Sequence, residues 1–236
     1  MTYKIQSCVF ALMLSWGVCT TTAQPIAKIK KGDYKKDIQI KTDSGELILR
    51  LHEQTPLHRN NFIRLVKSGY YNGIGFHRVI SGFMIQAGDE KTKKNFDSTK
   101  GLKNYTIPAE FNPNLFHKRG VLAAARMGDN VNPKKESSGV QFYIVQGRIF
   151  TDKSLDSVET YRMNGRKLPI EHRAEYKSSG GAPHLDQNYT VFGYLVEGYN
   201  VLDKIGNTAT SGKTGGDKPL ADIRIQQARL IKRSKE

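Results

Sequence analysis

Cysteine and tryptophan are scarce in this chain. Among its 236 residues there are two cysteines, Cys8 and Cys19, and one tryptophan, Trp16, so residues 20–236 contain neither type. That part of the chain can therefore form no disulfide and can use no thiol chemistry. The six histidines lack a metal-ligand spacing such as H-E-x-x-H. We predict no metal site and no cofactor.

The apolar segment near the N-terminus is too short to cross a membrane. It runs from Val9 to Val18, whereas a spanning helix needs about 20 residues. Lys4 precedes it and small residues up to Ala23 follow it, which is the pattern of a secretory signal. We predict a signal peptide over residues 1–23, cleaved after Ala23, and a periplasmic or secreted protein with no transmembrane segment. A lipoprotein anchored at Cys19 and a membrane anchor are the alternatives.

Acidic residues are few relative to basic ones. The chain has 22 Asp and Glu against 37 Lys and Arg, a formal net charge of +15, and cleavage after residue 23 would remove one lysine and leave +14. Such an excess can attract nucleic acid or anionic lipid. The lysines are scattered apart from the Lys28 to Lys36 cluster, and no nucleic-acid-binding pattern accompanies them. We predict a flexible basic leader over residues 24–36, a solvated basic surface and no specific nucleic-acid partner.

Local patterns predict a hairpin followed by a helix. Residues 37–42 and 46–51 alternate apolar and polar side chains, and a turn-forming Asp-Ser-Gly sequence lies between them. Thr55 and Pro56 can begin a helix, because threonine caps and proline suits the first helical position. Apolar residues then recur at helical spacing as far as Gly69, where glycine ends the helix.

Short strands dominate the rest of the chain. Residues 147–182 form a charged insert with helices expected over 152–162 and 170–177, and residues 200–205 form a second framework helix. Many short strands with only two framework helices are typical of a closed β-barrel whose ends are covered by helices. The expected strands cover residues 120–125, 140–145, 190–195, 221–225 and 229–231.

The segment FHRVISGFMIQAGD, residues 76–89, combines unusual side chains in a strand–turn–strand pattern. A fixed cation, an aromatic ring, a thioether and an amide suit binding of a small apolar ring beside a polar amide. No Ser or Cys here lies beside a base, and no carboxylate pair is present, so hydrolysis is not predicted. Phe83 and Met84 are adjacent, and on a strand only one of them would face a given side. From spacing alone, both would be assigned to the core.

Three further segments accompany it in order: GVLAAAR (120–126), SGVQFY (138–143) and LD (185–186) followed by VFG (191–193). Together they closely resemble the cyclophilin-type peptidyl-prolyl cis-trans isomerases over roughly residues 37–232. The resemblance implies a mostly β fold, a closed antiparallel eight-stranded barrel capped by two helices, here with a partly helical insert. It also implies a monomer that acts on X–Pro bonds in unfolded or extended polypeptides, without a cofactor.

The resemblance also assigns site residues. Arg78 matches the catalytic arginine, and Phe83 and Gln86 complete the catalytic set. Tyr143 stands where Phe is usual, His184 where Trp is usual in many eukaryotic members, and Tyr189 where His is usual; the pattern is more like that of bacterial members. The implied substrate-binding residues are the pocket walls Met84, Tyr143 and Leu185, the groove amide Gln141, the strand edge Ala125 and Arg126, and the rim residues His184 and Tyr189.

The chemistry of the X–Pro bond explains why an arginine would serve. The amide isomerises slowly because its C–N bond has partial double-bond character, with a barrier of about 18–20 kcal/mol. In the twisted transition state the proline nitrogen regains a lone pair, and a donor to that nitrogen favours this state over both planar forms. Arg78 is always charged and carries a planar fork of donors. We therefore expect an isomerase that assists folding of exported proteins.

A second interpretation belongs to a different class. The chain could be a proline-peptide binding module or chaperone in which turnover is incidental, given its substituted rim and basic charge. In either case the insert at 147–182 lies between two segments that border the expected pocket. Because insertions of that length are often functional, we expect it to fold over or beside the groove and to influence which clients enter.

Overall fold

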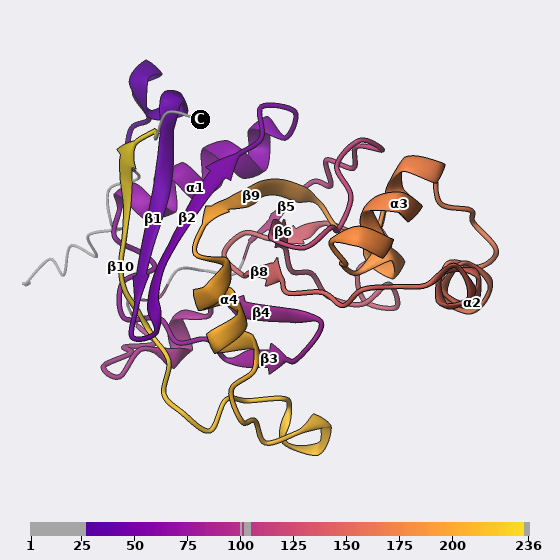
Figure 1. The fold of residues 1–236 in the computed structure, drawn as a ribbon. Helices are drawn as coiled ribbons and strands as arrows, with labels where there is room; N and C mark the ends of the chain where they lie inside the picture. The colour runs from indigo at the N-terminus through magenta and orange to yellow at the C-terminus, as the bar shows by residue number, and fades with distance from the viewer. Residues whose placement is uncertain (1–26, 100, 102–104, 234–236) are drawn as a thin grey trace, which may run out of the picture.

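A computed structural model describes residues 27–99, 101 and 105–233 (Figure 1). The predicted signal peptide, its cleavage point and Cys19 lie outside the described residues. Within the expected leader, residues Lys31–Lys35 form a 3-10 helix, η1. The Asp33 carboxylate of η1 is buried and lies 2.6 Å from Lys67 Nζ, so this segment is tied to the first α-helix.

The predicted hairpin is confirmed as strands β1 (Lys36–Thr42) and β2 (Gly45–Leu51). Ile38 pairs with Leu49 and Ile40 pairs with Leu47 in antiparallel register, and all four side chains are buried. The alternation of apolar and polar residues buries these four side chains together, because paired residues of neighbouring strands point to the same face of the sheet.

The main sheet has eight strands in the order β10-β1-β2-β9-β6-β8-β4-β3, and every neighbouring pair is antiparallel. A separate two-stranded sheet joins β5 (Thr106–Ile107) to β7 (Ser137–Ser138). The expected strand at 221–225 does not form; a single strand begins at its last residue. The other strands are β3 (Arg78–Ile80), β4 (Met84–Ala87), β6 (Val121–Ala124), β8 (Phe142–Val145), β9 (Val191–Glu197) and β10 (Ile225–Lys232).

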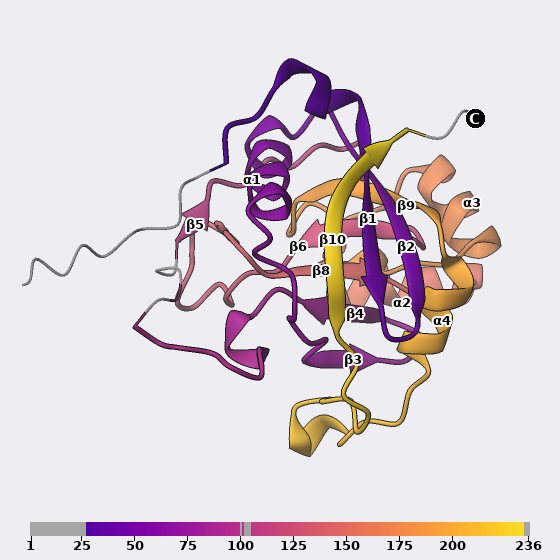
Figure 2. The ribbon, with the colours of Figure 1, turned by 90° about the vertical axis from the view of Figure 1, so that its left-hand side faces the viewer.

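The prediction of a closed barrel is wrong. The sheet curls as an open half-barrel, with β10 and β3 as its two edges in the described part of the chain (Figure 2). β3 is only three residues long, and the chain before it is irregular. Gly73 N–H donates to the Ile225 carbonyl and Phe76 N–H to the Ile223 carbonyl, at 2.7 and 2.9 Å. Scattered backbone bonds thus link the two ends where a strand ladder would be needed for closure.

The two framework helices form close to where the sequence places them. Helix α1 (Pro56–Lys67) begins with proline, and helix α4 (Tyr199–Gly206) follows β9. α1 packs near β10 and β9, whereas α4 packs near β2, β3 and β4. No helix of the described residues is long and apolar enough to cross a membrane. Three short 3-10 helices complete this framework: η2 (Glu90–Thr92), η3 (Pro183–Leu185) and η4 (Lys213–Gly215).

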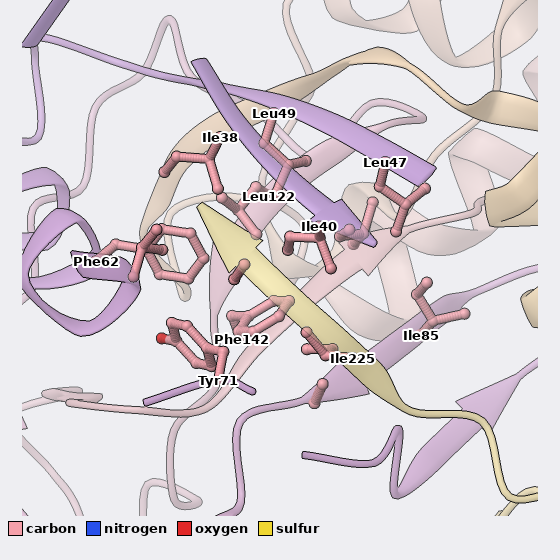
Figure 3. Packing of buried hydrophobic residues seen from close by; sticks show 14 of the residues in the cluster. Ile38, Ile40, Leu47, Leu49, Phe62, Tyr71, Ile85, Leu122, Phe142 and Ile225 are labelled. Atoms are coloured by element: carbon pink, nitrogen blue, oxygen red, sulfur yellow. The ribbon is translucent and has the colours of Figure 1, made fainter. Parts of the chain in front are cut away.

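The main hydrophobic core fills the concave side of the curled sheet. Three aromatic rings meet there: Phe62 of α1 and Tyr71 each lie 5.3 Å from Phe142 of β8, centroid to centroid (Figure 3). Ile38 and Ile85 pack into the same cluster and are fully buried. At about 25 cal/mol per Å² of buried apolar surface, such a cluster is the main source of stability.

The insert has a small core of its own. Helices α2 (Asp152–Arg162) and α3 (Ile170–Ser178) agree with the predicted helices to within one residue. They lie on the side of the molecule remote from β10 (Figures 1 and 2). Their buried Glu159 carboxylate is 2.8 Å from Arg173 and 2.9 Å from Lys167. The cluster beneath them consists of Phe150, Leu155, Val158, Met163, Leu168 and Tyr176, with Phe116 packed against it.

Candidate active site

The candidate site lies on the outer face of the sheet, which is the face turned away from the main core. In β4, Ile85 and Ala87 enter the main core, so Met84 and Gln86 face outward. In β8, Phe142 faces the core and Tyr143 the outer face. Alternate residues of β4 and β8 therefore pack in the core or face the candidate site.

Four strands carry one row of site residues. Arg78 of β3 pairs with Gln86 of β4, which pairs with Tyr143 of β8, which pairs with Ala123 of β6. Directly paired side chains share a face and lie about 4.5–5.5 Å apart at Cβ. The row thus runs from a cation through an amide to an aromatic ring. Gln141 joins it from the side, because Gln86 Nε2 donates to Gln141 Oε1 at 3.0 Å.

Phe83 and Met84 both belong to this site, although they are adjacent. β4 begins at Met84, so Phe83 lies in the preceding turn and does not follow strand alternation. The Phe83 carbonyl accepts from Gln146 N–H and Gly147 N–H, both at 3.0 Å, which fixes the turn. Met84 is buried in a second apolar cluster, here called the outer-face cluster, and Phe83 packs against it. The cluster consists of Met84, Val121, Ala123, Ala125, Tyr143, Val145, Ala182, Leu185 and Val191. Spacing alone assigns both residues to a core; Met84 is 2% exposed in a buried apolar cluster, but that cluster lies on the outer face and Phe83 is only partly buried against it.

The outer-face cluster supplies apolar walls from several segments. Met84, Tyr143, Ala125 and Leu185 are each at least nine-tenths buried, and Tyr189 packs against them while remaining half-buried. The rings of Tyr143 and Tyr189 meet edge to face with centroids 6.0 Å apart. This arrangement can hold a small apolar ring by contact alone.

His184 closes one end of the site as a neutral residue. It is held by η3, and its ring centroid is 5.3 Å from that of Phe83. Burial is the main cause that lowers the pKa of His184 to about 4, and the nearby Arg162 acts in the same direction. At neutral pH this histidine presents an uncharged ring beside Phe83.

Arg126 combines a buried side chain with an open backbone edge. Its guanidinium lies 4.5 Å above the Tyr189 ring, donates to the Asn188 carbonyl at 2.7 Å and pairs with Asp129 at 2.6 Å. Its side chain is only 5% exposed, so it supports the rim. Ala125 uses its N–H to bond the Gln141 carbonyl and its carbonyl to accept from Ser138. In the described residues, the backbone N–H and carbonyl of Arg126 make no such bonds, so the open strand edge is at Arg126.

Arg78 is the accessible cation of the row. Its side chain is 45% exposed, and its Nε is 3.3 Å from Asp217 Oδ2. A guanidinium held through Nε still has two terminal nitrogens with which to donate. All eleven predicted site residues are thus located around one outer-face cluster and its rim.

Four residues that hold the site side chains in place were not predicted from the sequence. Asp217 lies in a glycine-rich loop with no recognisable pattern, and Tyr176 lies in the insert. His117 precedes the strand β6, and Asp186 follows the pocket residue Leu185. Their importance follows from burial and from hydrogen bonds between separate segments, which the sequence does not reveal. Among the described residues, no group of three or more His, Cys, Asp or Glu is arranged to hold a metal.

The fold and the site together define a cyclophilin-like isomerase domain. The family model for cyclophilin-type peptidyl-prolyl cis-trans isomerases matches residues 37–230. The chain belongs to that family, and its enzyme class is peptidyl-prolyl cis-trans isomerase.

Known proteins resemble the chain over most of its length. A protein of Staphylococcus saprophyticus assigned as a peptidyl-prolyl cis-trans isomerase is 35% identical, over 80% of this chain and 89% of that protein. A protein of Streptococcus pyogenes assigned as a bifunctional phosphatase and isomerase is 38% identical over 80% of this chain, but the chain spans only 37% of it. A cyclophilin-type isomerase of Cryptosporidium parvum matches with a TM-score of 0.60 and 25% identity, covering 84% of this chain and 99% of that one. The same protein was also solved in the presence of the dipeptide Ala-Pro.

Proposed function

We propose that this protein accelerates cis/trans exchange of X–Pro bonds in exported proteins and so assists their folding. The observation that carries the proposal is the row in which Arg78 pairs with Gln86 and Gln86 with Tyr143, beside an apolar cluster. The Cryptosporidium parvum relative was solved with a proline dipeptide, which supports proline peptides as the ligand class here.

The proposed mechanism follows from this geometry. The proline ring rests against Met84, Phe83 and Tyr143, while Gln86 and Gln141 bind the neighbouring peptide groups. Arg78 then donates a hydrogen bond to the proline nitrogen as the amide twists, which stabilises the transition state more than either planar state. Charge-assisted hydrogen bonds contribute roughly 1.5–3 kcal/mol, and each ~1.36 kcal/mol is tenfold in rate. Neither a covalent intermediate nor a cofactor is required.

A protease-coupled assay on a set of short X-Pro peptides tests this proposal. We expect the wild-type protein to speed the cis-to-trans phase in proportion to its concentration, with a preference among residues X. An uncatalysed rate for every peptide would refute the isomerase proposal. Mass spectrometry of the mature protein tests export separately: a chain beginning after Ala23 supports it, and a lipid on Cys19 indicates an anchored lipoprotein.

A client-binding function is the second candidate, and the insert gives it support. Tyr161 and Ile170 are each 82% exposed and Ile149 is 66% exposed, which is high for apolar side chains. A pocket of about 220 Å³ is lined by residues of several segments, none of them a predicted site residue or part of the insert. One lining residue, Leu115, packs against the outer-face cluster. Another, Phe116, stacks on His172 of α3 with ring centroids 3.8 Å apart.

We propose that the insert shapes which clients enter, without supplying a catalytic group. An aggregation assay with an unfolded client separates the two functions. Protection that survives Arg78→Ala favours a chaperone with incidental turnover, and protection lost together with activity favours the isomerase. We propose a monomeric protein with no specific nucleic-acid partner for both cases.

A further inference from the structure

We propose that Tyr176 of the insert is a positioning residue for the proline pocket, acting on the ring of Tyr143 through Asp186 and His117. The inference rests on the proposed isomerase function and deepens it. It gives the insert a mechanical connection to the site, and it gives a reason for a tyrosine at position 143.

The four side chains form a continuous chain of hydrogen bonds. Tyr143 Oη lies 2.9 Å from His117 Nε2, and His117 Nδ1 lies 3.0 Å from Asp186 Oδ1. The other carboxylate oxygen, Asp186 Oδ2, accepts from Tyr176 Oη at 2.8 Å. The chain therefore runs from a pocket wall on β8 to helix α3 of the insert.

One set of proton positions satisfies every polar group in this chain of hydrogen bonds. Burial raises the pKa of both tyrosine hydroxyls, so each keeps its proton and can donate. In that set Tyr143 is the donor to His117 Nε2, and the ring carries its proton on Nδ1. That Nδ1–H then donates to Asp186, as does the His117 backbone N–H at 2.8 Å. Every donor in the chain thus has an acceptor.

Because the four side chains are buried, their hydrogen bonds hold them in a single arrangement. His117 and Tyr176 are fully buried, and Asp186 and Tyr143 are 3% and 4% exposed. Water cannot replace a lost partner at such positions, so removing one hydroxyl leaves its neighbour unsatisfied. The Tyr143 ring is therefore held at its hydroxyl as well as by packing, whereas a phenylalanine there would be held by packing alone.

The backbone of the insert strengthens the same connection. Ala182 N–H donates to the His117 carbonyl at 2.8 Å, and Arg166 donates to the Asp186 carbonyl. The backbone at Gly181 lies close to both residues. A Cβ there would lie 2.4 Å from the His117 carbonyl oxygen and 2.6 Å from the Tyr176 ring. His117 is thus fixed by the end of the insert through both backbone and side chain.

The decisive variant is Tyr176→Phe, which removes one hydroxyl and leaves the ring packing intact. We expect kcat/KM on a short X-Pro peptide to fall roughly three- to tenfold. The matched control is Tyr199→Phe, the same substitution on a 41% exposed tyrosine of α4, outside both the site and the insert, and it should keep the wild-type kcat/KM. In a Tyr143→Phe background, Tyr176→Phe should have no further effect, because the ring it acts on is no longer tethered.

A readout independent of turnover separates failure of this inference from failure of the isomerase function. NMR spectra of the imidazole nitrogens should show His117 as the Nδ1–H tautomer, and both Tyr176→Phe and Tyr143→Phe should shift these resonances. Tyr143→Phe enters the chain from the pocket end, so it serves if Tyr176→Phe fails to fold. Unchanged His117 resonances in a folded variant, or equal losses from Tyr176→Phe in both backgrounds, would overturn the inference whatever the wild-type activity is.

Discussion

Arg78 Nε lies 3.3 Å from Asp217 Oδ2, although the two residues are 139 positions apart. The loop that carries Asp217 docks on β3, since Val79 N–H donates to the Asp217 carbonyl at 2.9 Å. Asp217 itself has a left-handed φ of 57°, an uncommon conformation for a residue other than glycine. The carboxylate thus holds the inner end of the guanidinium and leaves its outer nitrogens for a ligand.

We predict that Asp217→Asn lowers kcat/KM by roughly two- to fivefold, because the ion pair is partly exposed and such pairs contribute up to about 1 kcal/mol. The measurement is the peptide exchange assay, with thermal unfolding to confirm the fold. Asp222→Asn is the control, since Asp222 pairs with Arg224, outside the site. Equal activity in Asp217→Asn and wild type would show that Arg78 needs no such support.

The second prediction concerns stability at low pH. The pKa of His184 is lowered to about 4 in the folded protein from an ordinary value of 6.5. As pH falls below 6.5, the unfolded chain takes up a proton that the folded protein resists, so stability falls until pH reaches about 4.

His184→Gln should reduce this pH dependence. We expect the loss of unfolding free energy between pH 7 and 4.5 to be smaller in the variant by on the order of 2 kcal/mol. Urea denaturation at both pH values measures it. His52, His58, His77 and His172 also have lowered pKa values, so only the difference between the two proteins reports on His184. Parallel pH profiles would contradict the burial of this ring.

The third prediction separates the insert surface from the pocket. Replacing the exposed Tyr161 and Ile170 together by serine should leave turnover of a short peptide unchanged, because neither residue belongs to the outer-face cluster. Protection or refolding of an unfolded protein client should decline. Leu57→Ser is the control, since Leu57 is 49% exposed on α1 and outside the insert. Identical client refolding by the wild type, the double variant and Leu57→Ser would show that the insert surface does not bind clients.

Local signals in the sequence predicted much of the fold. Alternation gave the β1–β2 hairpin, and Pro56 marked the start of α1. Closure of the sheet depends on pairing between distant edges, which no local pattern reports, and the short β3 left it open. Strand alternation does not apply to Phe83, because β4 begins one residue later.

The motif residues of the site were predictable, but their supports were not. The resemblance located the row from Arg78 to Tyr143 because those residues lie in continuous, recognisable segments. His117, Asp186 and Tyr176 meet only after the insert has folded against the sheet. Their partnership depends on burial and on bond geometry between separate segments, which composition and spacing do not encode.

The most direct test of the account is the exchange rate of one X-Pro peptide with wild type, Arg78→Lys and Arg78→Ala, measured by NMR exchange spectroscopy. Arg229→Ala is the control, since this exposed arginine lies on β10 and bonds Gln39. We predict wild-type rates for Arg229→Ala, a loss of roughly 10- to 100-fold for Arg78→Ala and an intermediate loss for Arg78→Lys, which keeps the charge but not the fork of donors. Equal catalysis by wild type and Arg78→Ala would contradict the central claim that Arg78 stabilises the twisted amide.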